Sequence, residues 1–272
     1  MYKLIVCDLD ETLLDNHAQI SKANEQAIKQ FVAQGGYFVP NTGRSFLTVQ
    51  ANLKQLGLIG KKDQYVISYN GGAIIENAAN QVLATNPLDF ATVKKIYDIA
   101  QAEHVSGHIY TLENLYIWHP SRSEKDYLAQ RNIHYQLVTD DQLSFLKGQP
   151  LMKIILQDDD PARRRALGAA IPPKVAAPLT TTYSSSRYVE FNHVNADKGK
   201  ATQQLAKKLG IKPDEVIALG DNSNDLAMLR AAGLGISVQN GTPEVKAAVD
   251  YVTEADNAHN AVAEAIKKFA LQ

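Results

Sequence analysis

Two aspartates one residue apart, Asp8 and Asp10, directly follow the apolar run at residues 4–6. The run has the composition of a buried strand, and aspartate is a poor strand former. Two carboxylates at the end of one strand also repel each other unless a cation lies close to them. This arrangement therefore indicates a site at which carboxylate oxygens perform a chemical task.

Three further segments place polar side chains where a predicted strand or loop passes into a helix. They are Thr42 and Gly43 of "NTGR", Lys198 at the start of a predicted helix, and Asp221, Asn224 and Asp225 of "GDNSND". Each segment alone is typical of a helix cap. Because ligands of open parallel sheets bind outside the carboxyl ends of the strands, the segments together predict one shared site.

A cluster of this composition suits a divalent cation and a phosphate group. Carboxylates are the protein ligands that Mg²⁺ takes, together with waters and substrate phosphate oxygens. The cation would relieve the repulsion among Asp8, Asp10 and Asp221, while Lys198 and Thr42 would hold the remaining phosphate oxygens. Carboxylates also act as covalent nucleophiles and form aspartyl-phosphates. The residues thus favour Mg²⁺-dependent phosphoryl transfer.

Short apolar runs alternate with helical periodicity in the first and last parts of the chain. Strands are expected at 2–6, 37–40, 65–68 and 216–219, and helices at about 20–35, 46–57, 201–210 and from 257. Asn70 and Gly71 predict a two-residue hairpin turn. This order predicts the α/β class, with a doubly wound parallel sheet covered by helices on both faces.

The pattern changes between residues 87 and 187, where aromatic strands such as "GHIYT" and "LYIWH" alternate with polar helices. Such a segment is typical of an α+β insertion with an antiparallel sheet. We therefore expect residues 1–84 and 189–272 to form one catalytic core. Residues 85–188 are expected to form a second domain inserted into that core.

The composition gives no reason to expect a large charged partner. A formal net charge of −1 does not favour nucleic acid or an anionic membrane. Cys7 is the single cysteine, so an intramolecular disulfide is impossible, which is typical of a reducing compartment. Because no apolar run suits a signal peptide or a membrane span, we expect a cytoplasmic protein. The composition leaves the oligomeric state open.

In this order, "DLDETLL", "TGR", "KG" and "GDNSND" resemble the four motifs of the haloacid dehalogenase (HAD) superfamily. The insertion between the second and third motifs resembles the type IIB cap of the Cof-like sugar-phosphate phosphatases, and "YNGG" is similar to an Asn-Gly segment of that group. The resemblance covers the whole chain. It implies a HAD-like (Rossmannoid) core, Mg²⁺ as cofactor, and a phosphatase acting on small phosphorylated metabolites, with sugar phosphates the first expectation.

The resemblance also implies a role for each motif residue. Asp8 would be the nucleophile, and Asp10 would protonate the leaving alkoxide and then deprotonate the attacking water. Mg²⁺ would be held by the Asp8 carboxylate, the Asp10 backbone carbonyl and Asp221. The implied phosphate-holding residues are Thr42, Gly43, Lys198 and Asn224, with Asp225 orienting Lys198 or metal waters.

Three positions near the motifs depart from the commonest pattern of that superfamily. Glu11 stands where glycine is frequent, and we expect its side chain to point outward. Asn41 stands where a small apolar residue is usual, and a polar segment precedes Lys198. Thr12 is expected to brace its own loop in preference to a phosphate group.

Four other residues are candidate substrate contacts, each with a simpler alternative. Arg44 could contact substrate or pair with an acid, and Asn70 could face the site or serve only its turn. Arg187 and His193 are candidates because the chain is expected to return there from the inserted domain to the core. The remaining histidines fit no compact zinc-ligand spacing; they include His104, His108, His119 and His134.

Two other classes of function remain open at this stage. A non-enzymatic phospho-receiver module shares the parallel sheet and the acidic cluster, but it lacks a residue like Asp10 and a hundred-residue cap. A phosphomutase-like enzyme would use the same chemistry on a dedicated substrate. Among substrates, sugar phosphates, nucleotides, and flavin or pyridoxal phosphates are all compatible with the motifs.

Overall fold

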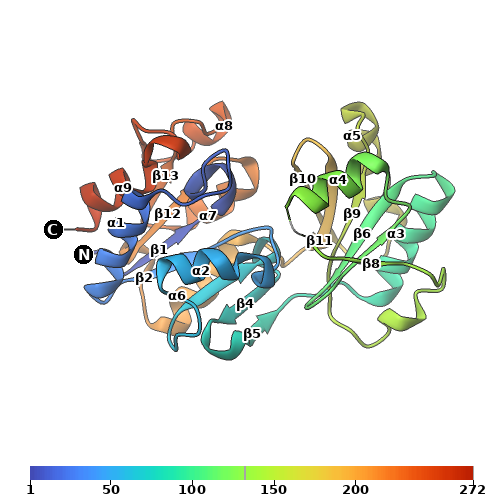
Figure 1. Cartoon of the computed structure of the whole chain (residues 1–272), viewed down its shortest axis with the longest axis horizontal. Coiled ribbons are helices and arrows are strands. Elements are labelled where there is room, and N and C mark those ends of the chain that lie inside the picture. The colour runs from blue at the N-terminus through green and yellow to red at the C-terminus, as the bar shows by residue number, and fades with distance from the viewer. Residues whose placement is uncertain (132, 272) are drawn as a thin grey trace. The chain divides into compact units, whose positions relative to one another are not determined.

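The computed structural model describes residues 1–131 and 133–271. It divides into two compact units, a core of Met1–Thr85 with Asp197–Gln272 and a cap of Asn86–Ala196 (Figure 1). The chain returns to the core at 196/197, eight residues later than the expected boundary at 188/189. The reason is that β11 (Tyr188–His193) pairs on one side with β9 (Leu151–Gln157) and on the other with β10 (Leu179–Ser184), both in the cap.

A five-stranded parallel sheet forms the centre of the core unit. Its order is β14-β13-β12-β1-β2, and every adjacent pair is parallel. The strands are β1 (Leu4–Cys7), β2 (Tyr37–Pro40), β12 (Val216–Gly220), β13 (Leu234–Ser237) and β14 (Tyr251–Val252). The predicted α/β class with a doubly wound parallel sheet is therefore confirmed.

Helices of the core pack around this sheet in pairs. Leu4 and Val6 of β1 share an apolar cluster with residues of α6 (Lys198–Leu209) and α7 (Leu226–Ala231). A second pair, α1 (Lys22–Ala33) and α9 (Ala261–Phe269), packs side by side (Figure 1). Two shorter helices complete the unit, α2 (Gln50–Leu56) and α8 (Pro243–Lys246). Within the described ranges, none of the helices is long and apolar enough to cross a membrane.

The predicted hairpin after the third strand has a longer turn than expected. β3 (Tyr65–Ser68) and β4 (Ala73–Glu76) are antiparallel and are followed by β5 (Gln81–Thr85). Because Ser68 pairs with Ala73, the turn has four residues instead of two, and three of them, Tyr69, Asn70 and Gly71, have positive φ. A Cβ atom on Gly71 would lie 2.3 Å from the Asp197 carbonyl oxygen, so this turn requires glycine to pack beside the start of α6.

The cap is an α+β unit built on a six-stranded sheet. The order is β10-β11-β9-β6-β7-β8, and all pairs are antiparallel except β7 with β8. The remaining strands are β6 (Ser106–Thr111), β7 (Leu115–Trp118) and β8 (Gln136–Leu137). One face carries the apolar core with α3 (Phe90–Ala102) and α5 (Pro161–Ala170), whereas Leu128 of α4 (Arg122–Gln130) packs on the other face with Leu115 and Ile117.

Candidate active site

The parallel register of β1 and β12 brings the two main acidic segments to one edge of the core sheet. Cys7 pairs with Leu219, and the Asp8 amide donates a hydrogen bond of 3.0 Å to the Leu219 carbonyl. β12 ends one residue later, so Asp8 and Asp221 leave adjacent strands at the same level. Both side chains are buried, which makes an unpaired negative charge on either of them costly.

Lys198 provides the buried positive charge of this cluster. Its ammonium donates to Asp8 Oδ1 at 2.7 Å and to Asp225 Oδ1 at 2.6 Å, and its side chain is fully buried. The position of Lys198 is set by the start of α6, where the Asp197 side chain accepts a hydrogen bond from the Lys200 amide at 2.7 Å. The predicted helix start therefore aims the lysine at Asp8.

The turn after β12 is organised by the second oxygen of Asp225. This oxygen accepts hydrogen bonds from the backbone amides of Asp221 at 3.0 Å and of Asn222 at 3.1 Å. A Cβ atom on Gly220 would lie 2.5 Å from the Cβ of Asp225, so only glycine allows this turn to close. Asp225 thereby fixes both the ammonium of Lys198 and the backbone that carries Asp221.

The loop after β1 makes a contact that differs from the expectation. Residues 9–13 form one tight turn, closed by a 2.8 Å hydrogen bond from the Leu14 amide to the Leu9 carbonyl. Thr12 does not brace this loop; its buried hydroxyl donates to Asp221 Oδ1 at 2.6 Å. Glu11 has a φ of +59°, the left-handed region that glycine adopts most easily, and its side chain is exposed as expected.

The loop after β2 carries a second group of predicted residues. The Asn41 amide donates to the Cys7 carbonyl at 2.8 Å, which places the following buried Thr42 at the same sheet edge as Asp8. A Cβ on Gly43 would lie 3.0 Å from Asn70 Oδ1, and Asn70 Oδ1 also accepts from Asn224 Nδ2 at 3.4 Å. Gly43, Asn70 and Asn224 are thus brought together.

Arg44 takes the second of its two expected alternatives, pairing with an acid in the site. Its Nε donates to Asp10 Oδ2 at 2.8 Å, and its terminal nitrogen donates to Asp10 Oδ1. This is a two-point pairing of the kind for which the planar guanidinium is suited. Arg44 therefore fixes the orientation of the Asp10 carboxylate.

The burial of these charges shifts their pKa values. Burial raises the pKa of Asp8 well above its usual range despite the opposing effect of Lys198. Burial and the neighbouring Asp225 raise the pKa of Asp221 to about 7, although the Thr12 hydroxyl opposes this. For Lys198, burial would lower the pKa, but Asp225 and Asp8 raise it above its usual value. The lysine is charged, whereas the carboxylates lack enough positive charge around them.

This shortage of positive charge fits a divalent cation. Among the described residues, carboxylate oxygens of Asp8, Asp221 and Asp225 lie within 4.8 Å of one another. Three acidic side chains then face a single ammonium, and oxygen donors of this type are those preferred by Mg²⁺. The arrangement could hold such a cation beside the buried acids.

Comparison with known proteins agrees with this geometry. A family model described as haloacid dehalogenase-like hydrolase matches residues 5–266. The putative phosphatase YxeH of Bacillus subtilis is 34% identical over 100% of this chain and 99% of its own length. The chain belongs to the haloacid dehalogenase-like hydrolase family. The predicted hydrolase class is therefore confirmed.

Two further similarities extend over nearly the whole chain. The 5-amino-6-(5-phospho-D-ribitylamino)uracil phosphatase YcsE of Bacillus subtilis is 29% identical over 99% of this chain and 96% of its own length. A solved HAD subclass IIB sugar phosphatase superposes with a TM-score of 0.85, covering 99% of this chain and all of its own. At 20% identity the latter shows the fold alone, and this chain shares that fold.

Two predicted substrate residues, Arg187 and His193, lie in the cap unit of this HAD chain and have partners there. Arg187 donates to Glu124 Oε2 at 2.9 Å, and His193 Nδ1 accepts from the Asn195 amide at 3.1 Å. Glu124 also accepts from the Tyr188 hydroxyl at 2.6 Å and lies 3.1 Å from His108 Nε2. Burial alone would raise the pKa of Glu124, but these neighbours lower it to about 2. Arg187 is thus part of a buried cap network.

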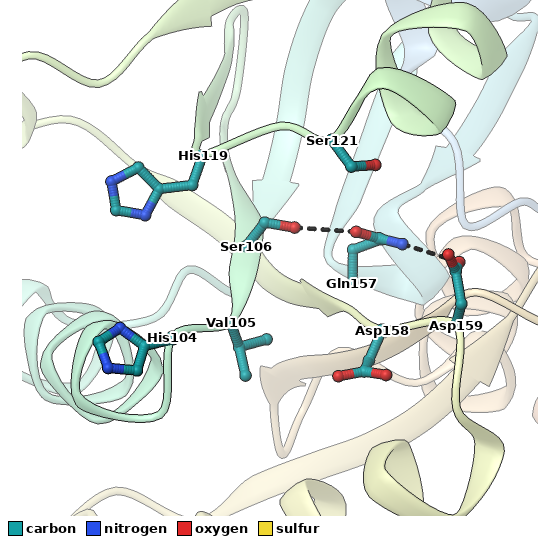
Figure 2. Close-up of a pocket in the computed structure, with 8 residues that line it drawn as sticks. All are labelled: His104, Val105, Ser106, His119, Ser121, Gln157, Asp158 and Asp159. Carbon is teal, nitrogen blue, oxygen red and sulfur yellow. Dashed lines mark hydrogen bonds between the residues drawn. The ribbon is translucent and has the colours of Figure 1, made fainter.

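Two of the cap histidines, His104 and His119, lie at a hollow of the cap unit. The hollow has a volume of about 330 Å³ and is also lined by Asp158 and Asp159 (Figure 2). In the hollow, Gln157 accepts a hydrogen bond from Ser106 at 2.9 Å and donates to Asp159 at 3.0 Å. The side chains of Ser106, Gln157 and Asp159 are therefore hydrogen-bonded to one another.

Asn41 is a residue whose importance the motif pattern does not reveal. It is fully buried, and its amide nitrogen lies 3.1 Å from the Lys198 carbonyl and 3.2 Å from the Thr202 hydroxyl. These contacts join the end of β2 to the first turn of α6. The only sequence signal was that a polar residue stands where a small apolar one is usual in HAD proteins.

Proposed function

We propose that this protein is a Mg²⁺-dependent phosphatase that hydrolyses small phosphorylated metabolites, with sugar phosphates as the leading substrate class. The reaction would pass through an aspartyl-phosphate on Asp8, with Asp10 as general acid and base. Support comes from membership in a hydrolase family whose relatives named above are phosphatases. The hydroxyl-rich ribityl group in the name of YcsE further favours polyhydroxylated esters.

One observation carries the proposal: Lys198 lies between Asp8 and Asp225 while Asp221 is close beside them. The ammonium is within 2.7 Å of both carboxylates, and all four residues are buried. Buried titratable groups gathered at the carboxyl edge of a parallel sheet are a recognised sign of a functional site. A purely structural role for three buried acids and one lysine would leave a costly excess of negative charge.

Each residue of the site would have a distinct role in binding or catalysis. Lys198 holds Asp8 in place and offers positive charge to the phosphate, and Asp225 keeps Lys198 oriented. Thr42, Gly43 and Asn224 would bind phosphate oxygens from the loops after β2 and β12. Asp8 would attack phosphorus while a protonated Asp10, released from Arg44, supplies a proton to the departing oxygen; the resulting Asp10 carboxylate would later take a proton from water.

The cation would be held by the carboxylates of Asp8 and Asp221 and by the backbone carbonyl of Asp10. When bound, Mg²⁺ would neutralise the acids and the charge of the phosphate group. Asp225 already accepts hydrogen bonds from Lys198 and from two backbone amides. It would therefore orient the residues around the cation without binding the cation itself. Thr12 would orient Asp221 through its hydroxyl.

The test is phosphate release from p-nitrophenyl phosphate and from a panel of phosphorylated metabolites. Wild-type protein with Mg²⁺ should release phosphate over many turnovers, EDTA should stop release, and added Mg²⁺ should restore it. Asp8→Asn should abolish turnover with an unchanged circular dichroism spectrum. Asp10→Asn should slow release most for esters with poor leaving groups.

The same assay separates the alternatives. A phospho-receiver would release at most one phosphate per protein, and family membership already disfavours it. A phosphomutase-like enzyme would convert one sugar phosphate into another without releasing phosphate. Equal activity of Asp8→Asn and wild type would refute the proposed nucleophile.

A further inference from the structure

Asn41 makes two sets of contacts at the edge of the core sheet, one through its backbone and one through its side chain. Its backbone amide donates a 2.8 Å hydrogen bond to the carbonyl of Cys7, the residue directly before Asp8. Its side-chain amide nitrogen donates to the Lys198 carbonyl at 3.1 Å and to the Thr202 hydroxyl at 3.2 Å. Asn41 is therefore bonded both to the strand that leads to Asp8 and to the helix that carries Lys198.

The contacts on α6 form a closed group of three residues. The Thr202 hydroxyl, which accepts from Asn41, itself donates to the Lys198 carbonyl at 2.8 Å. All three residues are at most 1% exposed. We call Asn41, Thr202 and Lys198 the Asn41 clamp. Hydrogen bonds are electrostatically stronger in such a buried setting than in water, so the clamp holds the first turn of α6 against the end of β2.

Stability alone does not explain an asparagine at this position. The Asn41 amide oxygen is buried and has no hydrogen-bond partner among the described residues. An unpaired buried acceptor costs free energy, and a small apolar residue would avoid that cost. Departures from the most stable choice are expected at functional sites. The benefit of Asn41 therefore lies in what its amide nitrogen holds in place.

The position of the Lys198 ammonium depends on the first turn of α6. The four-carbon stem of lysine separates the ammonium from the backbone, and here the side chain is fully buried. A side chain packed in this way cannot freely change rotamer to compensate for a shift of its backbone. A displacement of the Lys198 carbonyl would therefore move the ammonium away from Asp8 and Asp225, from which it now lies 2.7 and 2.6 Å.

We propose that Asn41 is a positioning residue, which sets the distance between the Lys198 ammonium and Asp8 through the Asn41 clamp. The inference rests on the phosphatase function proposed above, in which Lys198 holds Asp8 and offers positive charge to the phosphate. Asn41 acts on the reaction through Lys198.

The first measurement compares the kcat/KM of Asn41→Ala and wild type on p-nitrophenyl phosphate and glucose 6-phosphate. The variant should lose about tenfold or more, since a misplacement of about 1 Å can cost about a hundredfold. The loss should be similar for both esters, because Lys198 acts on the nucleophile and the phosphate and not on the departing oxygen. A merely structural role would leave the kcat/KM of the folded protein unchanged.

Asn24→Ala is the matched control. Asn24 is also a fully buried asparagine of the core unit, and its amide oxygen accepts from the Ala263 amide at 2.9 Å, which joins α1 to α9. Its replacement should lower the melting temperature without changing kcat/KM. If Asn41→Ala does not fold, Thr202→Val and Thr202→Ser carry the test. The valine variant should lower kcat/KM, and the serine variant, which keeps the hydroxyl, should recover it.

The second measurement follows the Lys198 ammonium by NMR in protein that contains isotope-labelled lysine, without substrate. Buried, ion-paired ammonium groups exchange slowly with water and therefore give visible signals. Lys198→Met identifies the signal, and Lys153, which lies 2.8 Å from Glu190 in the cap, gives an internal reference. The Lys198 signal should shift or broaden in Asn41→Ala and stay unchanged in Asn24→Ala, while the Lys153 signal stays unchanged in both.

Three results would overturn the proposal. One is a kcat/KM of Asn41→Ala equal to that of wild type, and another is an unchanged Lys198 ammonium signal in that variant. If Asn41→Ala does not fold, equal kcat/KM values for Thr202→Val and Thr202→Ser would overturn it instead. If wild type releases no phosphate from any ester, the phosphatase function fails, and the NMR measurement still decides whether Asn41 positions Lys198.

Discussion

Replacement of Lys198 by methionine tests the electrostatic basis of the active site. The substitution keeps the length of the apolar stem and removes the ammonium that lies 2.7 Å from Asp8 and 2.6 Å from Asp225. Without it, three buried acids have no counter-charge within the cluster. Breaking a buried pair by removing one partner costs about 3–5 kcal/mol, because the remaining charge stays buried and uncompensated.

This cost should appear in the unfolding of the core alone. With a denaturant dependence of about 2 kcal/mol per molar urea, the midpoint should fall by about 2 M in EDTA. The chain offers one probe for each unit. Its single cysteine, Cys7, is buried in β1 of the core, and its single tryptophan, Trp118, is buried in β7 of the cap. Pulsed thiol labelling of Cys7 should report the shift, and tryptophan fluorescence reports the cap.

Two variants make the reasoning refutable. Lys208→Met removes an exposed lysine from the last turn of the same helix and should cost less than about 1 kcal/mol. Adding Asp225→Asn to Lys198→Met removes one uncompensated charge and should recover about 1 kcal/mol or more. Equal midpoints for Lys198→Met and Lys208→Met, or no recovery in the double variant, would show that the cluster is not held by its charge balance.

Three further predictions concern individual contacts. Arg44→Gln should lower kcat about tenfold with little change in KM, because Arg44 positions Asp10; a rise in KM alone would instead assign Arg44 to phosphate binding. Thr12→Val should weaken Mg²⁺ binding about tenfold in calorimetry by releasing Asp221, whereas unchanged affinity would exclude that role. For Glu124, neighbours lower the folded-state pKa to about 2 from the usual 4.5, so about 3 kcal/mol of cap stability should be present above pH 5 and disappear toward pH 2. Trp118 fluorescence should show this acid loss in wild type and not in Glu124→Gln, and equal acid sensitivity of the two would contradict it.

The sequence predicts the acidic cluster well because a parallel sheet leaves few choices. Once β1 and β12 are recognised as parallel strands, Asp8 and Asp221 must emerge at the same edge. Lys198 follows because it stands at the start of a predicted helix, and a helix start has a defined direction. These inferences need only strand direction, local periodicity and capping, all of which are encoded within short segments.

Contacts that depend on side-chain direction across long separations could not be predicted. Thr12 meets Asp221 across more than two hundred residues, and Arg44 turns back to Asp10 instead of remaining open to substrate. Thr12 could have formed a hydrogen bond within its own loop, and Arg44 could have contacted substrate. The return from the cap was misplaced for a similar reason, since "YVEFNH" is recognisable as a strand but does not show which sheet it joins.

The two units differ in how their buried charges are balanced, and this difference separates their roles. In the core, Asp8, Asp221 and Asp225 face one ammonium, so the described residues leave a negative excess that a cation could offset. In the cap, Lys153 pairs with Glu190 and Arg187 with Glu124, so these pairs leave no comparable excess. Among the described cap residues, the buried side-chain atoms without a hydrogen-bond partner belong to His108, Thr182 and Asn192. The charge imbalance is therefore a property of the core site, which agrees with the cation and phosphate binding proposed for it.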